Sequence, residues 1–135
     1  MTRYLADTSA WNRSRLVANR WGKLLEANEI GLCAPVRLEL LYSARGRSDY
    51  RAFASDLAWF PDFSLDGNAA SCAESTQAEL AERSGHRGPT PVDLLIAAIA
   101  DFHELVLLHY DRHFEQIGRV TGQPTEWLAR PGSLT

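Results

Sequence analysis

The sequence predicts an α/β sandwich in which helices flank a central parallel sheet of about four or five strands. Short apolar segments alternate with longer segments of helical periodicity, and this alternation favours parallel strands joined by helices. The most apolar strand segments, residues 3–6 and 105–109, are expected at the centre of the sheet, because such strands are buried on both faces. At 135 residues, the chain is expected to be a single domain spanning residues 1–135.

The expected elements follow one another in a largely alternating order. Strands are expected at residues 3–6, 30–34, 59–63, 105–109 and 126–128. After an irregular or helical stretch that contains Trp11, helices are expected at residues 19–27, 35–44, 49–57, 68–83, 91–102 and 112–117.

Proline and glycine set several of these boundaries. Pro35 suits the first turn of a helix, which should stop near Gly46. The strand at 59–63 should lie at a sheet edge, because Pro61 lacks the N–H donor that a central strand needs. Asn68 or a neighbour is expected to cap the long amphipathic helix, and the helix at 91–102 is apolar almost all round and should be buried.

Composition excludes several classes of protein. The chain is 45% hydrophobic and 23% charged, as in soluble globular proteins, and its longest apolar stretch is too short to span a bilayer. An acid, Asp7, lies where a signal peptide would need its apolar region, so a cytoplasmic location is expected. Cys33 and Cys72 then suit reduced thiols. The four histidines lack zinc-site spacing, and no phosphate-binding glycine loop is present.

The charge balance does not by itself indicate a nucleic-acid-binding protein. The formal net charge is −3, but arginine supplies all of the basic residues except Lys23. Arginine suits bidentate contacts with phosphate, although a coding bias would explain the same excess. The arginines near the acids, Arg13 and Arg15 among them, are expected to form a basic rim.

Four carboxylates stand at positions from which a folded chain could bring them together. They are Asp7, Glu39, Asp93 and Asp111. Asp7 and Asp111 follow the two central strands, and parallel sheets place their chemistry beyond the carboxyl ends of the strands. At a separation of about 4 Å, each like-charge pair costs on the order of 4 kcal/mol. A divalent metal site is therefore the favoured interpretation of such a group.

Each acid also has a structural interpretation. Thr90, Pro91 and Asp93 fit a capping box at the start of a helix. Asp111 could cap the next helix, and Asp7 could form a turn through local side-chain bonds.

Glu39 is the acid that local structure explains least well. It lies among leucines in a helix expected to pack closely, and an unpaired buried carboxylate is costly. A salt bridge to Arg37, Arg45 or another arginine is the structural alternative.

The segments around the acids resemble the PIN-domain ribonucleases, and among them the VapC toxins of bacterial toxin–antitoxin pairs. These segments are LADTSAW at 5–11, RLELL at 37–41, TPVDLLIAA at 90–98 and YDRHF at 110–114. None is specific alone, but their order and spacing in a chain of this size are specific together.

The resemblance implies a PIN-like sandwich, usually a homodimer, in which the four acids bind Mg²⁺ or Mn²⁺. Thr8 or Ser9 would orient a carboxylate or a water. A VapB-type antitoxin is the implied partner, and the alternative to a homodimer is a hetero-oligomer with this antitoxin. His113 stands where many relatives carry a further acid. The expected substrate-binding residues are Arg13, Arg15, Arg112 and His113.

The expected function is that of a Mg²⁺-dependent endoribonuclease toxin that hydrolyses RNA by a metal-activated water and inhibits translation or growth. The alternative is a catalytically silent PIN scaffold that binds antitoxin or RNA. A phosphoryl-accepting receiver domain is disfavoured, because it needs a lysine late in the chain and Lys23 is the only lysine.

Overall fold

A four-stranded, all-parallel sheet forms the centre of the computed structural model, which describes residues 1–134. The strand order is β2-β1-β3-β4, with β1 and β3 in the middle as the sequence predicts. Leu5 of β1 is in register with Gly31 of β2 and Leu107 of β3. The strands are β1 (Tyr4–Ala6), β2 (Ile30–Gly31), β3 (Val106–His109) and β4 (Thr125–Trp127).

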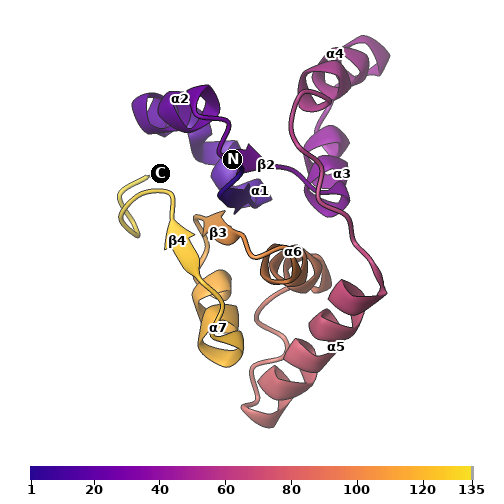
Figure 1. Cartoon of the computed structure of the whole chain (residues 1–135), viewed down its shortest axis with the longest axis vertical. Coiled ribbons are helices and arrows are strands. Elements are labelled where there is room, and N and C mark those ends of the chain that lie inside the picture. The colour runs from indigo at the N-terminus through magenta and orange to yellow at the C-terminus, as the bar shows by residue number, and fades with distance from the viewer. Residues whose placement is uncertain (135) are drawn as a thin grey trace.

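Helices surround this sheet, and α6 lies near the centre of the molecule in Figure 1. The α3–α4 pair lies to one side of it, and α7 with β4 lies to the other. The helices are α1 (Thr8–Arg13), the 3₁₀ helix η1 (Ser14–Val17), α2 (Ala18–Glu26), α3 (Ala34–Tyr42), α4 (Arg47–Leu57), α5 (Gly67–Glu82), α6 (Pro91–Phe102) and α7 (Arg112–Thr121).

The sheet is buried on both faces, because alternate strand residues enter two separate apolar clusters. Leu5 and Leu107 pack with buried residues of α3, α5, α6 and α7. Tyr4 and Leu108 point the other way and pack with residues of α1 and α2, Trp21 among them. This arrangement is the sandwich that the alternating sequence pattern predicts.

Two predicted strands are wrong in extent or in kind. The strand expected at 30–34 ends at Gly31, and α3 already begins at Ala34. No strand forms at 59–63. The N–H groups of Trp59 and Phe60 instead continue the turns that end α4. What remains is one isolated bridge between Leu32 and Asp62, because Pro61 offers only its carbonyl there.

Further boundaries also differ from the prediction. The cap of α5, expected at Asn68 or a neighbour, is Asp66, whose carboxylate accepts from the N–H of Ala69 at 3.0 Å. Helix α7 continues past the predicted residue 117 to Thr121, and Gly122 ends it at φ +76°. A Cβ at Gly118 would lie 3.3 Å from Thr125, so this glycine lets β4 pass close to α7.

Within residues 1–134 no helix is long and apolar enough to cross a membrane. Both cysteines are free thiols, and Cys33 is fully buried.

Candidate active site

The site begins where the two central strands end. Asp7 follows β1 and caps α1, and Asp111 follows β3 and caps α7. Because β1 and β3 are adjacent and parallel, their carboxyl ends lie side by side. The N–H of Tyr110 donates to the Ser9 hydroxyl at 2.8 Å and joins the two segments that carry these acids.

Asp7 is the most buried of the four acids, with 3% of its surface exposed. Its carboxylate accepts from the Ser9 hydroxyl at 2.7 Å, from the Ser9 N–H at 3.1 Å and from the Ala10 N–H at 3.1 Å. Its pKa is raised to about 7, mainly by burial and to a smaller extent by the nearby charge of Asp93, while these hydrogen bonds act in the lowering direction. The predicted local turn is therefore present, as an N-cap.

Asp93 combines a cap with a place among the acids. It forms the predicted capping box with Thr90, whose N–H donates to the Asp93 carboxylate at 2.9 Å and whose hydroxyl accepts from the Asp93 N–H at 3.1 Å. Burial raises its pKa, and the charges of Asp111 and Glu39 add to that increase. Asp93 therefore interacts electrostatically with each of the other three acids, which come from other elements.

Glu39 is exposed, which contradicts its expected burial. The side of α3 that packs into the core carries Val36, Leu40 and Leu41, and Leu38 is 69% exposed beside Glu39. Arg37 pairs with Asp62 instead, and none of residues 1–134 forms a salt bridge with Glu39. Its partner is the Thr8 hydroxyl, which donates to it at 2.5 Å.

Asp111 lies between two histidines. The N–H of His113 donates to its carboxylate at 2.9 Å, and His113 Nδ1 is 3.5 Å from the same oxygen. Beneath it, fully buried His109 accepts from the Asp111 N–H at 3.2 Å. Burial lowers the pKa of His109 to about 4, so the ring is neutral at pH 7 and supports Asp111 without adding charge.

As their side chains stand, the acids do not form a closed metal cage: within residues 1–134, no group of three or more His, Cys, Asp or Glu side chains is close enough to hold an ion. Capping bonds hold Asp7, Asp93 and Asp111 to the starts of their own helices, whereas Glu39 of α3 is bound to Thr8 of α1. The donor set nevertheless fits a hard divalent cation, since it consists of oxygens alone. In the described chain, no lysine or arginine forms a salt bridge with Asp7, Glu39 or Asp93.

Only some of the expected substrate-binding residues lie near the carboxylates. Arg13 lies near Ser9, whose carbonyl accepts from it at 3.3 Å, and its guanidinium stacks over Tyr110 at 5.0 Å. Arg112 and His113 begin α7 next to Asp111. Arg15 is exposed on η1, and nothing in residues 1–134 connects it to the carboxylates.

Sequence reasoning missed the role of Tyr110. Its N–H binds Ser9, its ring lies under Arg13, and its hydroxyl accepts from the N–H of Leu134 at 2.8 Å. Its place directly before Asp111 was a usable signal, but the tail contact could not be read from a local pattern.

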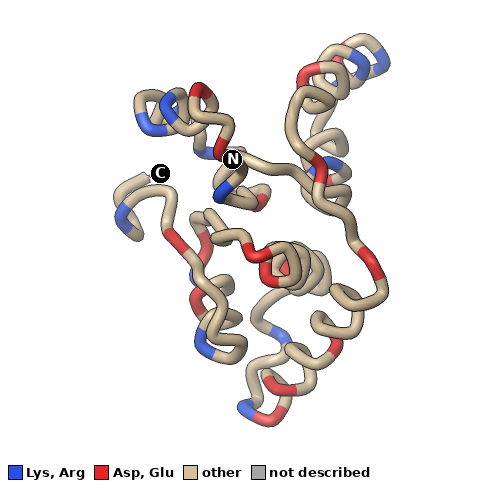
Figure 2. Tube along the Cα trace, in the orientation of Figure 1, with Lys and Arg blue, Asp and Glu red and all other residues tan. Residues whose placement is uncertain are grey.

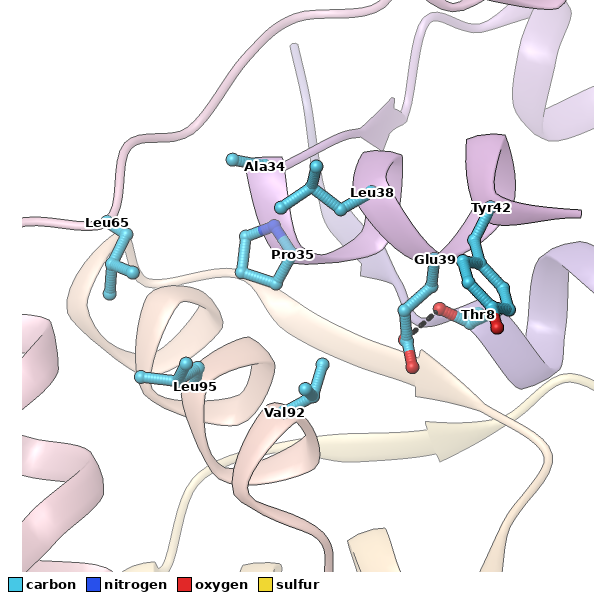
Figure 3. Close-up of a pocket in the computed structure, with 9 residues that line it drawn as sticks. All are labelled: Thr8, Ala34, Pro35, Leu38, Glu39, Tyr42, Leu65, Val92 and Leu95. Atoms are coloured by element: carbon cyan, nitrogen blue, oxygen red, sulfur yellow. Dashed lines mark hydrogen bonds between the residues drawn. The ribbon is translucent and has the colours of Figure 1, made fainter. Parts of the chain in front are cut away.

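An apolar groove of about 590 Å³ lies between α3 and α6, with Glu39 among its lining residues. Figure 3 shows Thr8 and Glu39 joined at one end of it, with Val92 and Leu95 facing Pro35 and Leu38 across it. Tyr42 of the same groove is 92% exposed. Apart from Glu39, its lining carries no charge.

A parallel sheet with acids gathered beyond its central strands is the architecture of a PIN domain, and the PIN domain family model matches residues 4–120. Ribonuclease VapC18 of Mycobacterium tuberculosis is 39% identical over 135 residues, covering 97% of this chain and 98% of that protein. Ribonuclease VapC51 of the same species is 37% identical over 134 residues, covering 98% and 97%. The chain therefore belongs to the PIN-domain family, among its VapC ribonucleases.

Solved structures agree on the fold. A DNA-bound VapBC from Salmonella typhimurium matches with a TM-score of 0.77 at 19% identity, covering 96% of this chain and 100% of that chain. VapBC2 from Rickettsia felis, bound to a promoter DNA fragment, matches with a TM-score of 0.74 at 17% identity, covering 93% and 98%. The predicted PIN-like sandwich is thus confirmed.

Proposed function

We propose that the protein is a Mg²⁺-dependent endoribonuclease that acts as the toxin of a toxin–antitoxin pair in the cytoplasm. The observation that supports this proposal is the position of Asp7 and Asp111 beyond the adjacent ends of β1 and β3, with Asp93 near enough to interact electrostatically with both of them and with Glu39. In the described chain, Asp7, Glu39 and Asp93 form no salt bridge. The proposal also draws on the names of the relatives, which are ribonucleases.

Asp7, Glu39, Asp93 and Asp111 would hold Mg²⁺, or Mn²⁺ in its place. When bound, the ion supplies an activated water and stabilises charge on the phosphate and the leaving 3′-oxygen. The chain's own contribution is positional. Ser9 fixes Asp7 and the Tyr110 backbone together, and Thr8 fixes Glu39, so that the carboxylates keep their orientation when substrate approaches.

Cleavage of a labelled RNA tests this proposal. The wild type should cut with Mg²⁺, stop in EDTA and resume when excess Mg²⁺ is added. Asp93→Asn keeps the cap oxygen but removes a charge, so it should fold and not cut. The alternative, a silent scaffold, predicts RNA binding without any Mg²⁺-dependent cut. Full activity in EDTA or in Asp93→Asn would contradict the metal mechanism.

We further propose a VapB-type antitoxin as the partner, and a homodimer as the toxin's own state. The solved structures of similar fold include VapBC assemblies, one of them a member of the VapBC family of toxin–antitoxin systems. The groove between α3 and α6 suits an apolar segment that ends in a basic side chain near Glu39. Light scattering of the free toxin tests the dimer.

Co-purification with the antitoxin encoded beside the gene tests the groove. Leu38→Glu places a charge at its exposed wall and should abolish the complex, while RNA cleavage persists. Leu16→Glu is the matched control, since Leu16 is 49% exposed on η1, outside the groove. Equal binding by both variants would contradict this assignment.

A further inference from the structure

A second hollow, of about 500 Å³, lies along α7 and β4. Arg112, His113, Gln116, Arg119 and Trp127 contribute to its wall. Its size suits a nucleotide, since small-ligand sites span roughly 300–1,000 Å³. His113, which lines the hollow, has its Nδ1 3.5 Å from the Asp111 carboxylate. The hollow therefore borders the proposed reaction site at His113.

The charges of this hollow suit phosphate groups. Arg112 and Arg119 are seven residues apart on one helix, about 10 Å along its axis. Both are exposed. Arg112 forms no salt bridge within residues 1–134. The only ion pair of Arg119 there is with Glu115 at 3.8 Å, an exposed contact that is weak and easily exchanged. Figure 2 shows basic and acidic positions along α7.

Glu115, the one acid in the wall, is occupied. The Trp127 indole N–H donates to its carboxylate at 2.9 Å. This bond and the packing of the Trp127 ring on His109 and Tyr110, at 4.8 and 5.4 Å between centroids, hold the indole in place. The ring stays partly exposed. A fixed, partly exposed indole is a surface on which a base can stack.

The two hollows beside the acids have opposite chemistry. The groove between α3 and α6 is apolar and bears only the negative charge of Glu39. This groove has no basic side chain to bind a polyanion. The α7 hollow has two guanidinium groups and an aromatic ring. The geometry therefore separates a path for RNA from the surface proposed for the antitoxin.

We propose that the α7 hollow is an RNA subsite for a nucleotide next to the scissile bond, with Arg112 and Arg119 binding phosphate groups and Trp127 stacking on the base. The inference rests on the proposed function, because it takes the carboxylates as the place where RNA is cut. It adds Arg119 and Trp127 to the substrate residues expected from sequence, and it assigns Arg112 a phosphate contact.

The test measures RNA binding in an Asp7→Asn background with Mg²⁺, where cleavage is absent under the proposed function. The probe is a fluorescein-labelled single-stranded RNA dodecamer of mixed sequence, followed by anisotropy at several salt concentrations. The variant is Arg112→Gln with Arg119→Gln. The matched control is Arg47→Gln with Arg51→Gln, two exposed arginines on one helix turn of α4, outside the hollow. Thermal unfolding checks that both remain folded.

The hollow variant should lose affinity at least about tenfold, since charged hydrogen bonds to phosphate are lost. The slope of log K against log salt should flatten by about 1.4, because each contact with a single-stranded phosphate contributes about 0.7. The control should stay within about twofold, because remote charges are screened. In Mg²⁺-dependent cleavage, the hollow variant should raise KM more than it lowers kcat.

Equal losses in the two variants, an unchanged salt slope in the hollow variant, or no binding of this RNA by the Asp7→Asn parent would overturn the inference. Wild-type cleavage of the same RNA separates the two failures. If the wild type cuts but the hollow variant binds normally, only the subsite is wrong. If no Mg²⁺-dependent cut occurs, or Asp7→Asn still cuts, the proposed function itself fails.

Discussion

Asp7→Asn should stabilise the metal-free protein at pH 8, although it removes a proposed metal ligand. Asp7 is 3% exposed, and burial raises its pKa from 3.8 to about 7. A shift of about 3 units corresponds to about 4 kcal/mol, at 1.36 kcal/mol per unit. Asparagine keeps one oxygen for the cap but loses a hydrogen bond, at a cost of about 1 kcal/mol. The expected net gain at pH 8 is therefore about 3 kcal/mol.

The sign of the pH dependence follows from the direction of the shift. Between pH 3.8 and about 7, the folded state keeps the Asp7 proton that the unfolded state has lost. The contribution of Asp7 to stability is therefore greatest below pH 3.8 and is lost as the pH rises to about 7. At pH 4, the variant should gain nothing over the wild type. Its advantage should appear between pH 4 and pH 8.

The titration of His109 changes stability with pH in the opposite direction, so its effect must be separated from that of Asp7. Its pKa is lowered to about 4, so its neutral form stabilises the fold above pH 6.5 and this contribution is lost as the pH falls to about 4. The two effects oppose each other in the wild type. Because both proteins retain His109, the difference between variant and wild type isolates Asp7.

Urea unfolding in EDTA at pH 4, 6 and 8, followed by circular dichroism, measures this difference. At pH 8 the gain corresponds to a Tm increase of about 10 °C for a chain of this size. Asp66→Asn, at the cap of α5, is the control for the cost of changing a cap carboxylate. Adding Mg²⁺ should then stabilise the wild type more than Asp7→Asn. A variant–wild-type difference that does not change with pH would refute the electrostatic reasoning.

Three further outcomes are expected. Thr8→Val removes the 2.5 Å hydrogen bond to exposed Glu39, so RNA cleavage should fall by about 10–100-fold while urea stability hardly changes; unchanged kcat/KM would contradict the positioning role. Phe114→Ala empties a fully buried site and should cost about 3–5 kcal/mol in urea unfolding, whereas a loss below about 1 kcal/mol would contradict the packing of α7. We also propose that residues 1–135 form one domain, so calorimetry should show a single transition, and two resolved transitions would count against it.

The sequence could predict what depends on local chemistry and on strand direction. Asp7 and Asp111 directly follow apolar strands, and the parallel geometry brings such positions together. The capping box of Thr90 and Asp93 is a contact over three residues, so its pattern is visible in the chain. From these features, the sequence alone predicts both the fold class and the positions of three acids, Asp7, Asp93 and Asp111, at the starts of helices.

One failed prediction concerns which face of a helix the rest of the fold covers. Glu39 was expected to be buried because leucines surround it, yet Leu38 and Glu39 lie at the open groove while Leu40 and Leu41 enter the core. The strand expected at 59–63 failed for a different reason. Its first residues are more favourably bonded to the last turns of α4, which apolar content alone does not reveal.

The chemistry of the cut ends tests the central claim most directly. Water attack with departure of the 3′-oxygen leaves a 5′-phosphate and a 3′-hydroxyl, whereas attack by the RNA's own 2′-hydroxyl leaves a 2′,3′-cyclic phosphate. We expect wild-type protein with Mg²⁺ to give 5′-phosphate and 3′-hydroxyl ends, and Asp7→Asn to give no cut. Cyclic phosphate ends, or the same cuts from Asp7→Asn, would contradict a carboxylate-held metal site.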